Sequence, residues 1–128
     1  MKLAPQVIAA FVVALALAAC GADSGQAGDP GLGEELYSSK LDPKSELFSC
    51  AECHSLDGSA SRGPTFQGIG ERASQRVAGM SAGEYLRESI VDPQAYVVEG
   101  FFFRMPAVFG PLLTDEDIDN LIAFMLTQ

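Results

Sequence analysis

Three reactive side chains lie within five residues of one another in the segment Cys50-Ala51-Glu52-Cys53-His54. Two thiols three positions apart can each form a thioether with a vinyl group of haem, and the adjacent imidazole can then bind the iron as an axial ligand. The spacing C-x-x-C-H is typical of this covalent attachment. The motif therefore predicts one covalently bound haem c, with Cys50, Cys53 and His54 as its binding residues and His54 as a metal ligand.

The motif alone leaves other uses of these residues open. A C-x-x-C pair can be a redox-active dithiol, but that chemistry expects a strand-rich βαβ surround, which this Gly- and Pro-punctuated sequence does not supply. A structural zinc site needs a fourth ligand, whereas the chain has a single His and its third Cys lies far away at position 20. An acidic side chain would have to complete such a site. A purely structural Cys pair is the remaining alternative.

The N-terminal residues predict export. Met1-Lys2 supplies a short positive start, and residues 7–17 form an unbroken apolar run, shorter than the roughly 20 residues that a spanning helix needs. This pattern is typical of a secretory signal. The run ends in Leu17-Ala18-Ala19-Cys20, which resembles the lipobox of bacterial lipoproteins, so we expect residues 1–19 to be a signal peptide and Cys20 to carry lipid. An ordinary signal peptide, which would leave Cys20 a thiol, is the alternative.

The cysteine count and the charge fit an anchored protein. Two cysteines bound to haem as thioethers and one lipidated cysteine account for all three. No unpaired thiol would then remain in the exported protein. A bacterial membrane lipoprotein facing the periplasmic or extracytoplasmic side is therefore expected, held by lipidated Cys20. Loss of Lys2 leaves 7 of the 8 basic residues against 17 acidic ones. Such a charge argues against nucleic acid as a partner and against electrostatic binding to anionic lipid.

Length and composition indicate a single small domain. Removal of residues 1–19 from 128 leaves 109 residues, enough for one domain. Residues 20–30 are rich in Gly, Ala and Asp without an apolar period, which predicts a flexible, lipid-anchored tether. The haem domain is expected to occupy residues 31–128.

Four helical segments and little strand are expected, which predicts an all-α fold. Residues 33–37 and 43–50 offer short helices, the second with a proline at its start. Ser81-Ala82-Gly83-Glu84 has the form of a capping box, and Asp92-Pro93 ends the helix that follows. Thr114 caps the last helix, with acidic residues in its first turn. Its apolar residues recur at the spacing of a buried helical stripe: Ile118, Leu121, Ile122 and Met125.

These segments together resemble the class I c-type cytochromes over about residues 31–128. The closing LTDEDIDNLIAFMLT is similar to the last helix of that family, and residues 62–68, RGPTFQG, resemble its segment after the haem motif. The resemblance implies a small all-α domain wrapped around one haem, with crossing N- and C-terminal helices. It also implies that Pro64 offers its backbone carbonyl to the second ring nitrogen of His54, which tunes the ligand.

The chain departs from the family in one place. The family's first helix runs almost directly into the haem motif, whereas twelve residues, Ser38 to Ser49, separate Tyr37 from Cys50 here. This leaves open which segment is the true N-terminal helix, and the extra residues are a candidate contact with a partner.

A thioether is the sixth iron ligand that the resemblance implies. Met105 lies in a loop and is followed by Pro106, like the Met-Pro of the family's distal ligand loop, so Met105 is expected to bind the iron. Met80, just before the capped helix, is the alternative. Met125 sits in an apolar helical stripe, where a methionine is more often core filling.

The loop around Met105 is unusually apolar. Its three consecutive rings, Phe101 to Phe103, cannot all enter one pocket, so at least one is expected to be exposed. An exposed ring is a candidate docking patch, although wrapping of a large cofactor explains most of the aromatic residues. Arg104 and Tyr96 are candidates for contacts with haem propionates, against commoner roles as an exposed Arg and a core-edge Tyr.

Ligation by His54 and Met105 would leave no open position on the iron, so electron transfer is expected, with no enzymatic reaction and no small-molecule substrate. If Met105 did not bind the iron, a haem peroxidase or sensor would be the alternative, although no distal acid–base pair is recognisable.

Part of the sequence indicates a respiratory partner. The stretch SAGEYLRESIVDPQAYVVEG, residues 81–100, together with the lipobox, is similar to the monohaem cytochrome lipoprotein subunit of alternative complex III, a quinol-oxidising membrane assembly. It also looks like cytochrome domains fused to cytochrome oxidase subunit II. The first resemblance implies a subunit of a multi-subunit respiratory complex that passes electrons toward a terminal oxidase. A tethered shuttle between complexes is the alternative.

Overall fold

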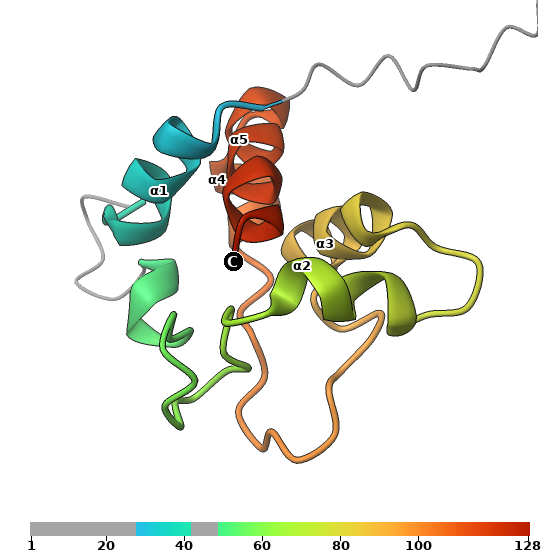
Figure 1. Ribbon diagram of the computed structural model, residues 1–128. Helices are drawn as coiled ribbons and strands as arrows, with labels where there is room; N and C mark the ends of the chain where they lie inside the picture. Colours follow the sequence, from blue (N-terminus) through green and yellow to red (C-terminus); the bar gives the residue numbers. More distant parts are fainter. Residues whose placement is uncertain (1–27, 42–48) are drawn as a thin grey trace, which may run out of the picture.

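The computed structural model describes residues 28–41 and 49–128, and in these ranges it contains helices and loops without a strand. The expectation of an all-α domain is confirmed. Figure 1 shows α1 and α5 side by side, α3 beyond them, and the long loop before α4 at the bottom of the view. In chain order the elements are α1 (Pro30–Ser38), the 3₁₀ turn η1 (Cys50–Glu52), α2 (Ile69–Arg72), the 3₁₀ turn η2 (Ala73–Gln75), α3 (Ala82–Val91), α4 (Phe109–Leu112) and α5 (Asp115–Leu126).

Helix α1 lies directly on α5, which is the crossing of N- and C-terminal helices that the resemblance implied. A Cβ at Gly33 would overlap the backbone carbonyl of Asn120 and crowd Phe124, so only a hydrogen fits there. Asp29 caps α1 by accepting a hydrogen bond from the backbone N–H of Gly31 at 2.7 Å. The backbone N–H of Asp29 in turn donates to the buried side chain of Asn120 at 2.7 Å. The start of the domain is therefore tied to its last helix.

The folded part begins earlier than the sequence patterns predicted. We expected a tether through residue 30 and a helix from residue 33, but Pro30 is already the first residue of α1. Gly28 also touches α5, because a Cβ there would meet the backbone of Asp119. The missed signal was Asp29-Pro30, an N-cap followed by a proline at the first helical position.

Some expectations fall on residues outside the described ranges. They are the signal peptide over residues 1–19, the lipid anchor at Cys20, most of the tether, and most of the helix expected over 43–50. Within the described ranges, no helix is long and apolar enough to cross a membrane.

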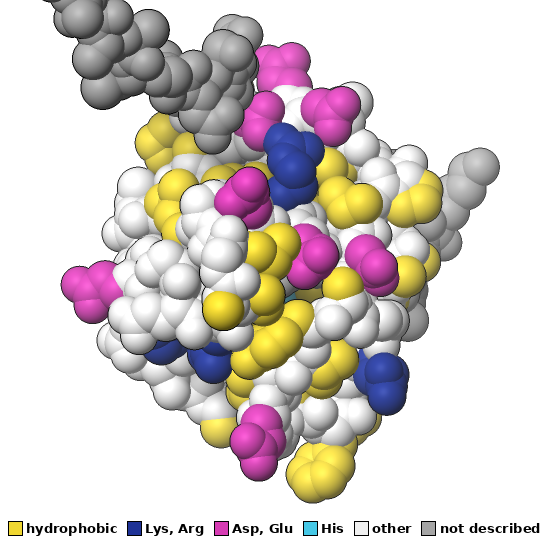
Figure 2. All heavy atoms as spheres, turned by 90° about the vertical axis from the view of Figure 1, so that its right-hand side faces the viewer, with side chains coloured by type: hydrophobic (Ala, Val, Ile, Leu, Met, Phe, Trp, Pro, Cys, Tyr) yellow, Lys and Arg dark blue, Asp and Glu magenta, His cyan; other side chains and the backbone are white. Residues whose placement is uncertain are grey.

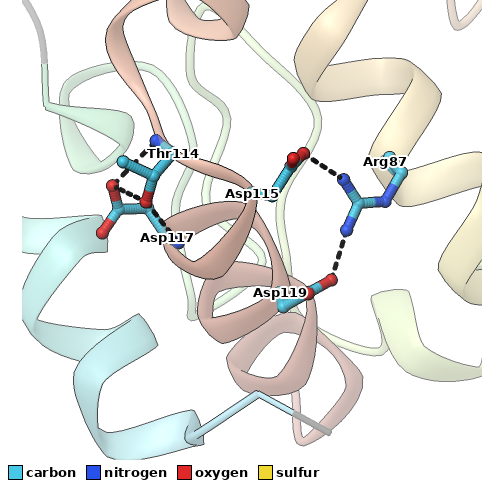
Figure 3. A network of polar contacts seen from close by, with 5 residues as sticks. All are labelled: Arg87, Thr114, Asp115, Asp117 and Asp119. Atoms are coloured by element: carbon cyan, nitrogen blue, oxygen red, sulfur yellow. Dashed lines mark hydrogen bonds and ion pairs between the residues drawn. The ribbon is translucent and has the colours of Figure 1, made fainter. Parts of the chain in front are cut away.

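Both expected caps are present as reciprocal pairs. The Ser81 hydroxyl accepts from the Glu84 backbone N–H at 3.2 Å, and the Glu84 carboxylate accepts from the Ser81 N–H at 2.7 Å. At the start of α5, Thr114 and Asp117 make the same two bonds at 3.1 and 2.9 Å (Figure 3). Each pair satisfies backbone N–H groups that a helix leaves free at its first turn. Local sequence therefore determines where α3 and α5 begin.

Helices α3 and α5 are joined mainly through apolar packing. On the surface, Arg87 of α3 reaches Asp115 at 3.3 Å and also pairs with Asp119 (Figure 3). Asp115 is 95% exposed, so such a pair adds at most about 1 kcal/mol. The buried apolar residues that form the core are Tyr37, Phe66, Ile69, Ala73, Tyr85, Leu86, Ile90, Phe109, Ile118, Leu121, Phe124 and Met125.

Candidate functional site

A cavity of about 340 Å³ lies between the C-x-x-C-H segment and the loop that carries Met105. Its walls are mostly apolar and come from η1, the segment before α2, α3, the loop after α3, and α5. The volume falls in the range of about 300–1,000 Å³ that is usual for ligand and cofactor sites. The chemically distinctive residues on its walls are Cys50, Cys53, His54, Arg62, Pro64, Arg76, Tyr96, Arg104 and Met105.

The C-x-x-C-H segment is wound into a turn that presents its side chains to this cavity. The backbone N–H groups of Cys53 and His54 both donate to the carbonyl of Cys50, at 3.1 and 2.9 Å. Cys50 and Cys53 are not joined to each other in a disulfide. Burial raises the pKa of the Cys50 thiol to about 11, so this thiol keeps its proton at neutral pH. A redox-active dithiol needs a thiol whose pKa is lowered, and the burial of Cys50 works in the opposite direction.

The ring of His54 is oriented by a backbone carbonyl. Its Nδ1 lies 2.7 Å from the carbonyl oxygen of Pro64, which is the contact that the resemblance implied. Because a carbonyl only accepts, Nδ1 carries the hydrogen and Nε2 keeps a lone pair for a metal. Burial lowers the pKa of His54, and the hydrogen bond to Pro64 partly opposes this. The imidazole is therefore neutral at pH 7, the form that binds metals.

The Pro64 carbonyl is itself held on both sides. Gly63 N–H donates to the carbonyl of Cys53 at 2.8 Å, and Phe66 N–H donates to the carbonyl of Ser55 at 2.7 Å. Both acceptors belong to the strip of chain that contains the C-x-x-C-H segment. These two bonds therefore fix the position of the Pro64 carbonyl relative to the His54 ring.

Phe66 and Gly63 also restrict the His54 ring, and Tyr37 supports them; the sequence had suggested a role for none of the three. Phe66 stacks on the imidazole with ring centroids 4.7 Å apart and an interplanar angle of 23°. Gly63 approaches so closely that a Cβ would come within 2.5 Å of Cε1. Tyr37 packs against Phe66 at 5.7 Å, and its hydroxyl donates to the His54 carbonyl at 2.5 Å. Burial raises the pKa of Tyr37, so its hydroxyl remains a donor.

The methionines differ in their relation to the cavity. Met105 is partly buried and lines the cavity from the loop after α3. Met80, the alternative distal ligand, packs against the edge of the core and does not line the cavity in the part of the chain described. Met125 is a buried core residue of α5 that also reaches the cavity wall.

Positive side chains gather at the cavity although the chain is acidic overall. Arg62, Arg76 and Arg104 line it, together with one acidic residue, Glu52. The Nε of Arg76 is buried and has no hydrogen-bond partner among the described atoms. A buried donor without a partner is costly, so an anionic group in the cavity, such as a haem propionate, would satisfy it. Nothing in the local sequence around Arg76 indicates that its Nε is buried.

The two side chains expected to meet propionates have other contacts. Arg104 lines the cavity, but its Nη1 donates to the side chain of Gln94 at 2.8 Å. Tyr96 also lines the cavity, and its ring packs edge-on against Tyr85 with centroids 5.8 Å apart. Arg76 is therefore the residue whose geometry most clearly fits an anion.

The zinc alternative finds no support in the described residues. Over 28–41 and 49–128, no group of three or more His, Cys, Asp or Glu side chains could hold a metal ion. The family comparison gives a positive assignment instead, because a cytochrome c model matches residues 32–128. The chain belongs to the cytochrome c family. Comparison with curated proteins gives no match.

Family membership and the C-x-x-C-H motif together establish that this cytochrome carries covalent haem c and transfers electrons. The residues present fit that cofactor: paired thiols on one turn, a neutral imidazole, apolar walls and a buried Arg76 Nε without a partner. When bound, the haem supplies an iron that alternates between the ferric and ferrous states. The chain holds it through its thiols and keeps water from it with apolar walls.

Proposed function

We propose that this cytochrome c is a pure electron carrier in which His54 and Met105 are the two axial iron ligands. The observation that carries the proposal is the bond from His54 Nδ1 to the Pro64 carbonyl, because it leaves a neutral Nε2 available to the iron. Met105 lines the same cavity. A thioether in the sixth position leaves no site for a substrate or gas, which suits electron transfer and not catalysis.

The restricted ring of His54 also suits this role. The hydrogen bond to Pro64 and the contacts with Phe66 and Gly63 hold the imidazole in one orientation. Tyr37 fixes the backbone carbonyl of His54. A ligand that moves little between redox states keeps the reorganisation of the site small. The apolar walls exclude water, which raises the reduction potential by disfavouring the more highly charged ferric state.

Electrons are proposed to pass at the rim of the cavity, where aromatic side chains reach the surface. Phe103 is 70% exposed and also lines the cavity, and its neighbour Phe102 is 97% exposed. Figure 2 shows hydrophobic side chains across the middle and lower part of one face, while most of the acidic side chains visible there lie in its upper half. A partner that docks against the exposed rings of Phe102 and Phe103 would approach the rim of the cavity directly.

The ligand assignment is tested with Met105→Leu. A Met-to-Leu exchange conserves volume and costs less than about 1.5 kcal/mol of stability, so the domain should remain folded. The variant should lose the thioether-to-iron absorption band, gain high-spin character and show a lower reduction potential. Met80→Leu is the matched control and should change none of these. An unchanged spectrum in Met105→Leu would refute Met105 ligation, and high-spin ferric iron in the wild type would favour a peroxidase or sensor.

We also propose that the cytochrome is anchored by lipidated Cys20 as a subunit of a quinol-oxidising respiratory complex that feeds a terminal oxidase. The support is sequence resemblance, in the lipobox and in residues 81–100. Gly28 already packs on α5, so only eight steps of chain join it to Cys20. At about 3.5 Å per residue they span at most roughly 28 Å. A domain held this close to the bilayer suits a partner embedded in the same membrane.

Membership of a complex and the lipid anchor are both tested in native membranes. Gentle solubilisation, a native gel and a haem stain should show this chain comigrating with a large, stoichiometric complex. A small free band would instead make it a tethered shuttle between complexes. Cys20→Ala should release the chain from membranes that lack the complex, and retention there would refute the lipid anchor.

A further inference from the structure

The loop that carries Met105, residues 96–108, has little backbone support. Among the described residues, 96–107 make no backbone–backbone hydrogen bond. Phe102 and Phe103 near its tip are largely exposed, and Figure 1 shows the loop extending away from the helices. Segments with few backbone bonds and little burial open at a low free-energy cost. A residue that holds this loop would therefore control how often Met105 leaves its place.

The side chain of Gln94 bridges two consecutive residues of this loop. Its Nε2 donates to the backbone carbonyl of Met105 at 2.9 Å, and its Oε1 accepts from Arg104 Nη1 at 2.8 Å. A guanidinium can only donate and a carbonyl can only accept. A side-chain amide in one orientation satisfies both, whereas a carboxylate or an apolar side chain cannot.

Gln94 projects from a well-supported part of the fold. It lies in a turn at the end of α3, closed by a hydrogen bond from Ala95 N–H to the carbonyl of Asp92 at 3.0 Å. Asp at the first position and Pro at the second are favoured in such a turn, and Pro93 is buried against the cavity. The Gln94 amide therefore ties the weakly supported segment to a rigid one.

We propose that Gln94 is a positioning residue for the distal ligand, which holds the Met105 backbone so that its thioether stays on the iron. This inference rests on the proposed ligation by His54 and Met105. An added ligand reaches the iron only when Met105 is released, so its apparent dissociation constant falls as the released fraction rises. The net free energy of one hydrogen bond changes the equilibrium constant for release of Met105 by a factor of about two to ten. Loss of the Gln94 donor should therefore tighten binding of an added ligand by about two- to tenfold.

The test uses Gln94→Glu in the ferric haem-loaded protein. Glutamate keeps the shape and the acceptor for Arg104, but it cannot donate to the Met105 carbonyl. Imidazole is titrated, and loss of the thioether-to-iron band reports displacement of Met105. Gln75→Glu is the matched control, because it makes the same change of charge at an exposed glutamine of η2 whose side-chain contact is the carbonyl of Glu71 at 3.4 Å. The expected result is an imidazole dissociation constant about two- to tenfold lower in Gln94→Glu alone.

The outcomes separate the inference from the function on which it rests. Equal imidazole affinities in the wild type and both variants, with the thioether band present, would overturn the role of Gln94. A lower urea midpoint in Gln94→Glu with unchanged imidazole affinity would overturn it too, since that is a merely structural effect. Absence of the band in the wild type would refute Met105 ligation itself. Should Gln94→Glu fail to hold haem, Gln94→Ala removes the same donor without adding charge and carries the same expected shift.

Discussion

Replacement of Gly63 by Ala tests how the proximal ligand is held. An added Cβ would lie 2.5 Å from Cε1 of His54 and 2.8 Å from Nδ1, whereas carbon atoms in contact prefer about 3.5–4.0 Å. Either the ring or the backbone must therefore move by about 1 Å. The backbone is tied by the bond from Gly63 N–H to the Cys53 carbonyl, so we expect the ring to yield and to strain its bond to Pro64.

The size of the effect follows from these contacts. Overpacking of a tight site costs about 1–3 kcal/mol, and the strained hydrogen bond adds about 0.5–1.5 kcal/mol. The reduced freedom of Ala in the unfolded chain offsets about 0.4–1 kcal/mol. The expected net loss is about 0.5–4 kcal/mol of the free energy of unfolding. For a domain of this size, each kcal/mol lowers the melting temperature by about 4–8 °C.

Two measurements check the reasoning in the haem-loaded protein. Urea unfolding followed by circular dichroism gives the loss of stability, and the low-spin electron paramagnetic resonance spectrum reports the orientation of the imidazole. Gly83→Ala is the control, because a Cβ at Gly83 meets nothing within 4 Å and should leave stability unchanged or raise it by up to about 1 kcal/mol. If Gly63→Ala were as stable as the wild type with an unchanged spectrum, His54 would not be held against Gly63, and the account of the proximal site would be wrong.

Replacing both Cys50 and Cys53 by Ala should abolish covalent attachment, and haem staining that survives denaturing electrophoresis would contradict the thioether assignment. Ser81→Ala should lower the free energy of unfolding by about 1 kcal/mol through loss of the helix cap, while the exposed control Ser74→Ala should change it by less than about 0.5 kcal/mol in the same urea experiment. Hydrogen bonds from Ser81 hold the pKa of Glu84 below its ordinary 4.5, so the stabilisation by this carboxylate is present above that pH and lost as the pH falls through the lowered folded-state value. The stability difference between wild type and Glu84→Ala should therefore shrink in this acid range, and a difference independent of pH would count against the capping role.

The elements that could be predicted are those with a strong local signal. The capped starts of α3 and α5 follow from side chains three residues apart, and their buried faces follow from apolar periodicity. Helices α2 and α4 were missed because four residues are about one turn, too short for any periodic pattern. The start of α1 was placed too late because its glycines resemble a tether, although the cap Asp29 and Pro30 at the first helical position were a local signal.

The residues of the candidate site also fall into two groups: those recognisable from local sequence and those that were not. The thiols and imidazole of the C-x-x-C-H motif were recognisable because their chemistry depends on covalent spacing within five residues. The Phe66 stack on His54, the buried Nε of Arg76 and the Gln94 bond to Met105 were not. Each depends on residues brought together by the fold, and the same residue types occur elsewhere in the chain without these roles.

By itself, the sequence determined the covalent chemistry of this cytochrome, its all-α class and the caps of its two longest helices, because bond formation, helix periodicity and capping act over a few neighbouring residues. The family resemblance already pointed to the Pro64 carbonyl as the partner of His54, but only the tertiary structure decided which arginine Nε is left without a partner at the cavity and which side chain bonds to the Met105 carbonyl. The bond from Gln94 to Met105 joins residues 11 positions apart, and the tie between Asp29 and Asn120 spans 91. Only the packing of the helices brings such distant groups within hydrogen-bonding distance, so no local pattern could have specified them.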